Sequence, residues 1–173
     1  MKKAVILIAD EYQDLEVWYP ILRLKEASWA VTTAGVDSKK EYKGKFGYPT
    51  TVDTHIDEIQ AKDFDCVIIP GGWAPDFIRR SQVALELVAQ MYRSGKIVAA
   101  ICHGGWVLAS AGILKGKQVT SFFAIKDDMI NAGAMWLDKD VVADDTIITS
   151  RKPDDLPVFC KAILATAERL EKK

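Results

Sequence analysis

Short apolar runs, each followed by a segment with helical periodicity, constrain the fold of this chain more than any other feature. The runs at 3–9 (KAVILIA), 65–70 (DCVIIP) and 97–101 (IVAAI) are almost continuously apolar, as strands covered on both faces are. Apolar residues at helical spacing predict amphipathic helices over 14–27 and 81–93. This alternation predicts an α/β fold in which a mostly parallel sheet carries helices on both faces.

The remaining segments extend this architecture. Turn residues between polar and aromatic positions predict a hairpin or ribbon over 39–52, and Asp144-Asp145 predicts the turn of an appended antiparallel β-hairpin over 140–150. The other predicted elements are strands at 29–34 and 117–121 and helices at 106–111, 125–132 and 155–170.

The strand over 97–101 stops at Cys102-His103-Gly104-Gly105, and a helix-forming segment begins at once. Because glycine permits a tight turn, Cys102 is expected on a strand-to-helix turn, with its sulfur near a helix N-terminus. That position lowers the pKa of a cysteine from its free value of about 8.5. Cys102 is therefore a candidate nucleophile, as serine is on the equivalent turn of α/β hydrolases. The alternative is a small buried core residue.

Three segments with candidate site residues follow predicted strands. They are 10–16 after the first strand, 70–76 after the third, and Cys102-His103 after the fourth. Because ligands bind at the carboxyl ends of strands in open parallel sheets, we expect a site where these segments meet.

The composition restricts the class of function. The 173 residues suit one domain with a sizeable core, and a formal net charge of −1 gives no reason to expect nucleic acid or a membrane as partner. No apolar stretch approaches the roughly 20 residues of a membrane span. Acidic residues follow the first apolar run where a signal peptide would have a cleavage site, so a cytoplasmic protein is expected.

Cysteine and histidine are scarce. Cys66, Cys102 and Cys160 have no CxxC spacing, and only His55 and His103 accompany them. Neither a disulfide framework nor a metal site is expected, and Cys66 and Cys160 are predicted in the core. Without a GxGxxG or Walker loop, no nucleotide cofactor is expected either.

Several motifs resemble those of the DJ-1/PfpI superfamily, and within it the PfpI-type branch of intracellular proteases and general stress proteins. They are Asp14-Leu15-Glu16-Val17 with Pro20, Pro70-Gly71-Gly72 with Ala74-Pro75, Ala100-Ile101-Cys102-His103-Gly104, Ser110-Ala-Gly-Ile-Leu with Gly116, AIKDDMINAG at 124–133 and SRKPDDL at 150–156. The resemblance implies a flavodoxin-like three-layer sandwich, with residues 1–173 as a single DJ-1/PfpI-like domain. It also implies a homodimer or hexamer, and no cofactor is expected.

The resemblance further implies the roles of the site residues. Cys102 would be the nucleophile, Glu16 would lie beside its sulfur, and the N–H groups of Gly72 and His103 would form an oxyanion hole. His103 would join Cys102 in a triad completed by an acid from a neighbouring subunit, and Asp76 stands at that position in place of the relatives' glutamate. Because two adjacent anions are unfavourable, Glu16 and the thiol would share a proton and titrate as a pair.

Each residue also has a plainer interpretation. Glu16 would otherwise be a helix-surface carboxylate, His103 a structural residue at a helix start, and Asp76 the N-cap of a helical turn. Gly71-Gly72 would be an ordinary strand-ending turn.

The sequence departs from the relatives at two places near the site. Gly105 replaces a proline, which loosens the helix start, and Phe122 replaces a tyrosine, which removes a hydroxyl donor. Trp73 and Trp106 flank the site in sequence and either narrow it or pack in the core. The ribbon lysines are expected at the solvated surface; they are Lys39, Lys40, Lys43 and Lys45.

These observations favour an enzyme in which Cys102 attacks an electrophilic carbonyl. Small reactive carbonyl compounds and their early adducts on proteins are the favoured substrates, as in glyoxalase III-like or deglycase chemistry, because Glu16 is suited to proton transfer. One alternative is a cysteine peptidase or amidase that relies on His103 and Asp76. Another is a non-catalytic oxidative-stress sensor acting through Cys102. A chaperone-like holdase, which would not depend on Cys102, is the weakest alternative.

Overall fold

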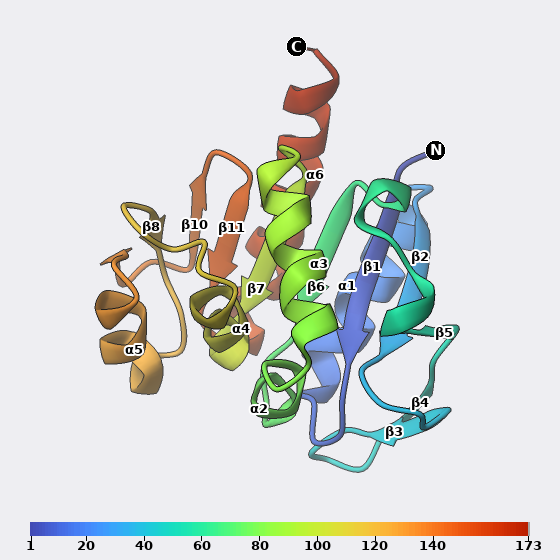
Figure 1. Ribbon diagram of the computed structural model, residues 1–173. Helices are drawn as coiled ribbons and strands as arrows, with labels where there is room; N and C mark the ends of the chain where they lie inside the picture. Colours follow the sequence, from blue (N-terminus) through green and yellow to red (C-terminus); the bar gives the residue numbers. More distant parts are fainter. Residues whose placement is uncertain (173) are drawn as a thin grey trace.

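A seven-stranded sheet runs through the centre of the computed structural model, which describes residues 1–172 (Figure 1). Its strands are β1 (Lys3–Ile8), β2 (Ala30–Gly35), β5 (Thr54–His55), β6 (Cys66–Ile69), β7 (Ile97–Ile101), β10 (Val141–Asp144) and β11 (Ile147–Ser150). The strand order is β10-β11-β7-β6-β1-β2-β5, and only the β10–β11 pair is antiparallel. The predicted hairpin is therefore appended to one edge, with β11 continuing the parallel sheet.

Helices cover both faces of this sheet. The α-helices are α1 (Asp14–Glu26), α2 (Ala74–Ile78), α3 (Gln82–Arg93), α4 (Gly105–Ser110), α5 (Lys126–Asn131) and α6 (Leu156–Glu171). Figure 1 shows α3 and α4 in front of the sheet and α1 and α6 behind it. Because both faces are covered, β6 and β7 are fully buried, which explains their continuous apolar runs.

Short elements complete the chain. Two small sheets pair β3 (Glu41–Lys43) antiparallel with β4 (Pro49–Thr51), and β8 (Gln118–Val119) parallel with β9 (Met135–Trp136). The 3-10 turns are η1 (Ile56–Glu58), η2 (Ala61–Asp63), η3 (Cys102–Gly104), η4 (Phe123–Ile125) and η5 (Pro153–Asp155). Within residues 1–172, no helix is both long and apolar enough to cross a membrane.

The predicted elements are confirmed with four differences. The sequence pattern did not predict α2, β5 or β9, which have five residues or fewer and so are shorter than the pattern needed to recognise an element. The strand expected over 117–121 is only β8, and it pairs with β9 outside the central sheet.

Candidate active site

The carboxyl ends of β1, β6 and β7 lie side by side. Parallel pairing sets Ile6 beside Ile68, and Ile68 beside Ala99, so the loops after the three strands meet at one edge. A cavity of about 460 Å³ opens there. Its lining comes from six parts of the chain: Glu11, Gln13, Glu16, Lys45, Phe46, Gly72, Trp73, Cys102, His103, Phe122 and Pro153.

Cys102 lies on the turn between β7 and α4 with a backbone φ of +60°. This left-handed conformation is uncommon for a residue with a side chain and is held by its surroundings. The turn also requires glycine opposite it, because a Cβ on Gly71 would lie 2.6 Å from the Cys102 Cβ and 2.9 Å from its Sγ. Gly71 therefore provides room for the sulfur and is more than an ordinary strand-ending turn.

Glu16 lies in the first turn of α1 and is completely buried, so the helix-surface interpretation is wrong. Its Oε2 accepts a hydrogen bond of 2.6 Å from the Gly71 N–H. Its Oε1 is buried and has no hydrogen-bond partner among the described residues. Burial raises the pKa of Glu16 to about 7, although the Gly71 bond and an interaction with Cys102 act in the opposite direction.

Burial also dominates at Cys102. It raises the pKa of the thiol to about 12, and the negative charge of Glu16 adds to the effect. The backbone of Gly72 and of His103 lowers this pKa less than burial raises it. The prediction that the helix N-terminus lowers the pKa of Cys102 is therefore wrong, because removal of the sulfur from water outweighs the dipole. The pair loses its first proton near pH 7 and then shares the remaining one.

His103 is directed at the sulfur. Its Nδ1 lies 3.3 Å from the Cys102 Sγ, and its ring packs against Trp73, Trp106 and Phe122 with centroids 6.4, 5.1 and 5.1 Å away. Burial lowers the pKa of His103, so the imidazole is neutral at neutral pH. A neutral imidazole at this distance is able to exchange a proton with the thiol.

Gly72 and His103 bring their backbone to the same place. Both lie next to the sulfur and act to lower the pKa of Cys102. Gly72 has a φ of +73°, and a Cβ there would lie 2.3 Å from the Glu11 carbonyl oxygen. The two residues predicted to form the oxyanion hole are therefore brought together beside Cys102.

Asp76 is not brought to this cavity. It belongs to α2, its side chain is partly exposed, and it forms an ion pair with Arg80 one turn further along. Trp73 occupies the N-cap position of α2, so the N-cap interpretation of Asp76 is wrong as well. Within its own chain, Asp76 does not line the cavity that holds His103.

The two departures from the relatives fit their surroundings. Phe122 stacks on the His103 ring at an interplanar angle of 28°. A Cβ on Gly105 would lie 2.7 Å from the Met129 sulfur, so the glycine lets α4 pack closely on α5. Trp73 is exposed and lines the cavity, whereas Trp106 is half-buried beside His103.

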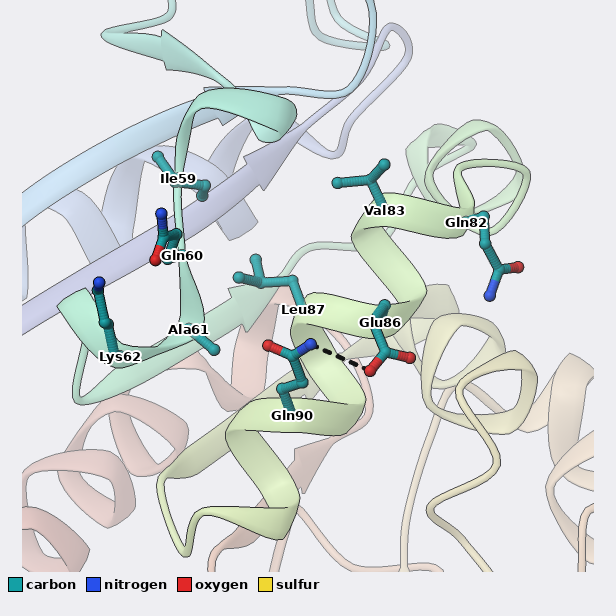
Figure 2. Close-up of a pocket in the computed structure, with 9 residues that line it drawn as sticks. All are labelled: Ile59, Gln60, Ala61, Lys62, Gln82, Val83, Glu86, Leu87 and Gln90. Carbon is teal, nitrogen blue, oxygen red and sulfur yellow. Dashed lines mark hydrogen bonds between the residues drawn. The ribbon is translucent and has the colours of Figure 1, made fainter.

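A second and larger cavity differs from the first in the side chains that line it. It measures about 540 Å³ and lies between the η1–η2 segment and α3, where Gln90 donates to Glu86 (Figure 2). Its described lining contains neither cysteine nor histidine. Within residues 1–172, no group of three or more His, Cys, Asp or Glu side chains is arranged to hold a metal ion.

Comparison with known proteins identifies the family of this chain. The profile of the DJ-1/PfpI family matches residues 2–166. The chain belongs to the DJ-1/PfpI family. The deglycase PfpI of Pyrococcus furiosus is 45% identical over 154 residues, which are 89% of this chain and 92% of that protein.

Other DJ-1/PfpI relatives carry different names. The putative cysteine protease YraA of Bacillus subtilis is 39% identical over 158 residues, 91% of this chain and 94% of that protein. The crystal structure of DJ-1beta from Drosophila melanogaster matches with a TM-score of 0.87 and 28% identity, covering 98% and 97% of the two chains. The predicted family and the flavodoxin-like fold are confirmed.

Sequence analysis missed one part of the site. Lys45 and Phe46, from the turn between β3 and β4, line the cavity. The ribbon itself was predicted, but nothing in its residue pattern indicates that it folds back onto the loop after β1. The bridge that Tyr12 forms with Gly44 makes this contact.

Proposed function

We propose that this protein is a Cys102-dependent enzyme that acts on reactive carbonyl compounds, as a protein deglycase or a glyoxalase III-like enzyme. The buried pair of Glu16 and Cys102 carries the proposal, because a carboxyl group with a pKa of about 7 lies beside a thiol. Such a group both donates and accepts a proton near neutral pH. The deglycase PfpI of Pyrococcus furiosus, 45% identical, supports the same reaction class.

The residues suggest a sequence of steps for a 2-oxoaldehyde. The Cys102 thiolate adds to the aldehyde carbon, and Glu16 protonates the new oxyanion while the N–H groups of Gly72 and His103 stabilise it. Glu16, now a carboxylate, removes the proton from the same carbon to give an enediol. Return of a proton to the neighbouring carbon produces a thioester, and water releases the 2-hydroxy acid and the free thiol.

Peptidase or amidase activity is a second candidate, which the 3.3 Å contact between Cys102 Sγ and His103 Nδ1 favours. A Cys-His pair of this kind cleaves amides when an acid orients the imidazole. Asp76 does not line the cavity of its own chain, so this activity would need Asp76 from a second subunit. The carbonyl reaction needs no such partner, and we therefore prefer it.

A non-catalytic sensor is less well supported. Thiols that oxidise readily combine a low pKa with exposure. Cys102 is buried and its pKa is raised, which argues against oxidation without substrate.

We further propose that the chain forms a homodimer or hexamer. Exposed apolar side chains gather around a hollow of about 490 Å³ on α1 and the β3–β4 turn, and they include Leu15, Leu22, Phe46 and Tyr48. Contiguous exposed apolar surface of this kind is typical of protein interfaces. Light scattering of the purified protein tests this, and a mass equal to one chain would contradict it.

Product analysis tests the proposed reaction. The purified protein and its Cys102→Ala variant are incubated with methylglyoxal, and substrate loss and lactate are measured. Lactate formed by the wild type and not by the variant supports the carbonyl reaction. Absence of turnover on methylglyoxal, together with Cys102-dependent cleavage of peptide amides, would replace it with the peptidase.

A further inference from the structure

The turn between β3 and β4 adds a positive charge to the Cys102 cavity. Lys45 lies on this turn and is exposed, as predicted for the ribbon lysines, but it also lines the cavity beside Glu16, Cys102 and His103. Among the described residues of that lining, it is the one lysine or arginine.

The backbone around Lys45 is fixed to the element that carries Glu16. The Lys45 N–H donates to the Tyr12 carbonyl oxygen at 2.9 Å. The N–H groups of Phe46 and Tyr48 donate to the two carboxylate oxygens of Asp14, each at 3.0 Å. Asp14 is the first residue of α1. These bonds therefore fix the position of the turn relative to the helix that carries Glu16.

The ammonium group of Lys45 is available to a ligand. Its Nζ lies 5.1 Å from the centroid of the Phe46 ring, and within the described part of the chain no carboxylate forms an ion pair with it. Lys39 on the same ribbon differs, since it is paired with Asp10. A lysine without a carboxylate partner at the mouth of a cavity is suited to bind an anion.

Among the described residues that line the cavity, Lys45 supplies the positive charge at neutral pH. His103 is neutral at neutral pH, and Glu16 is close to half-protonated. The positive charge of Lys45 lowers the pKa of both residues, so it reaches the reacting groups. Glu11 also lines the cavity, but its charge does not contribute to the pKa shift of either residue.

We propose that Lys45 forms an anion subsite beside Cys102, which selects 2-oxoaldehydes that carry a carboxylate over neutral ones. The selection rests on the proposed carbonyl function. In the reaction, the aldehyde carbon is oxidised and the neighbouring keto carbon is reduced, so water is the only co-reactant. Lys45 is a specificity-determining residue in this reaction and takes no proton.

Alkylation of Cys102 tests the subsite without any turnover. Iodoacetate and iodoacetamide have nearly the same size, and with both the thiolate forms an S–C bond while iodide leaves. The ratio of the two rate constants is independent of thiol pKa, because the same thiolate reacts with both. Mass spectrometry of peptides assigns the alkylation to Cys102.

The ratio is compared in wild type, Lys45→Met and Lys43→Met. Lys43 precedes Lys45 by two residues on the ribbon and does not line the cavity. We expect the iodoacetate-to-iodoacetamide ratio to fall about tenfold in Lys45→Met, the effect of one contact between a carboxylate and a partly solvated ammonium group. It should stay unchanged in Lys43→Met. An equal ratio in wild type and Lys45→Met would overturn the proposal.

Turnover of a matched substrate pair extends the test to the reaction. Phenylglyoxal and 4-carboxyphenylglyoxal differ by one carboxylate and would give mandelate and 4-carboxymandelate. We expect the kcat/KM ratio to favour the carboxylated substrate in wild type and Lys45→Arg, and to lose that preference in Lys45→Met. If neither substrate is turned over, the proposed function fails, while the alkylation ratio still decides whether the subsite exists.

Discussion

Cys102 and Cys160 are both buried thiols, and burial raises the pKa of each to about 12. Their surroundings differ. Cys160 lies inside α6 in the hydrophobic core. Cys102 lies on a turn at φ +60° with His103 Nδ1 at 3.3 Å and a protonatable Glu16 beside it. Burial and thiol pKa therefore do not distinguish a nucleophile in this fold, whereas neighbours that exchange protons with the sulfur do.

The largest expected effect separates the two thiols directly. Cys102→Ser should lower kcat on methylglyoxal by about 10³-fold or more, as loss of a nucleophile does. Cys160→Ala should leave kcat within about twofold, because Cys160 does not line the cavity. Steady-state kinetics of the two variants decide the matter, and equal losses would show that the effect is structural.

Glu16→Gln tests the role of the carboxyl group beside Cys102. We expect kcat/KM to fall by about 10² to 10⁴-fold, the usual range for a general acid–base group. In wild type, kcat/KM should rise with pH through about 7, as Glu16 and Cys102 lose their first shared proton. In the variant the inflection should move to higher pH, because the buried thiol then ionises alone.

An unchanged inflection near pH 7 in Glu16→Gln would assign that ionisation to another group. Glutamine keeps an oxygen able to accept the Gly71 N–H bond, so a loss of activity would reflect the proton and not the packing.

Gly71→Ala tests the room around the sulfur. The added methyl would lie 2.6 Å from both the Cys102 Cβ and Glu16 Oε2, so these groups must move apart. Because small misplacements of reacting groups are costly, we expect a loss of about 10²-fold in kcat. Gly95→Ala is the control: its Cβ meets open space, although its φ of +68° is unfavourable. It should lose stability and keep kcat, and a similar loss of kcat in both variants would contradict the steric argument.

The sequence predicts the scaffold of this site better than its electrostatics. The strands β1, β6 and β7 are recognisable because both faces are covered, so every residue must be apolar. The strand-to-helix turn at Cys102 follows from the glycines after it. The pKa of Cys102 does not, since its rise depends on burial and on the charge of Glu16, which is distant in sequence.

The position of Lys45 in the cavity could not be predicted from the sequence either. Its ribbon was predicted, but its place in the cavity depends on the carboxylate of Asp14, which accepts from the turn more than thirty residues later. Contacts of this range leave no local pattern, and the sequence therefore predicts the ribbon without predicting what it approaches.

Stability should depend on pH through Glu16. Its pKa is raised from 4.5 to about 7 in the folded protein, so the native state holds more protons than the unfolded state between these values. The free energy of unfolding should therefore fall as pH rises from about 5 to 7, by up to about 3 kcal/mol. Urea unfolding of wild type and Glu16→Gln at both pH values isolates this effect. The same fall in the variant would assign it to other groups.

The smallest expected effect completes the comparison of the two thiols. Cys160→Ala removes a buried sulfur from the core, and we expect a loss of about 1 kcal/mol in unfolding free energy, or about 2 to 4 °C in Tm. Cys102→Ala should cost less than this, because the Cys102 side chain lines a cavity and keeps 8% exposure, whereas Cys160 is fully buried. Thermal unfolding of the two variants at pH 7 measures the difference. A larger loss of unfolding free energy in Cys102→Ala than in Cys160→Ala would mean that the Cys102 side chain stabilises the fold. The strained backbone at Cys102 would then be no evidence for function.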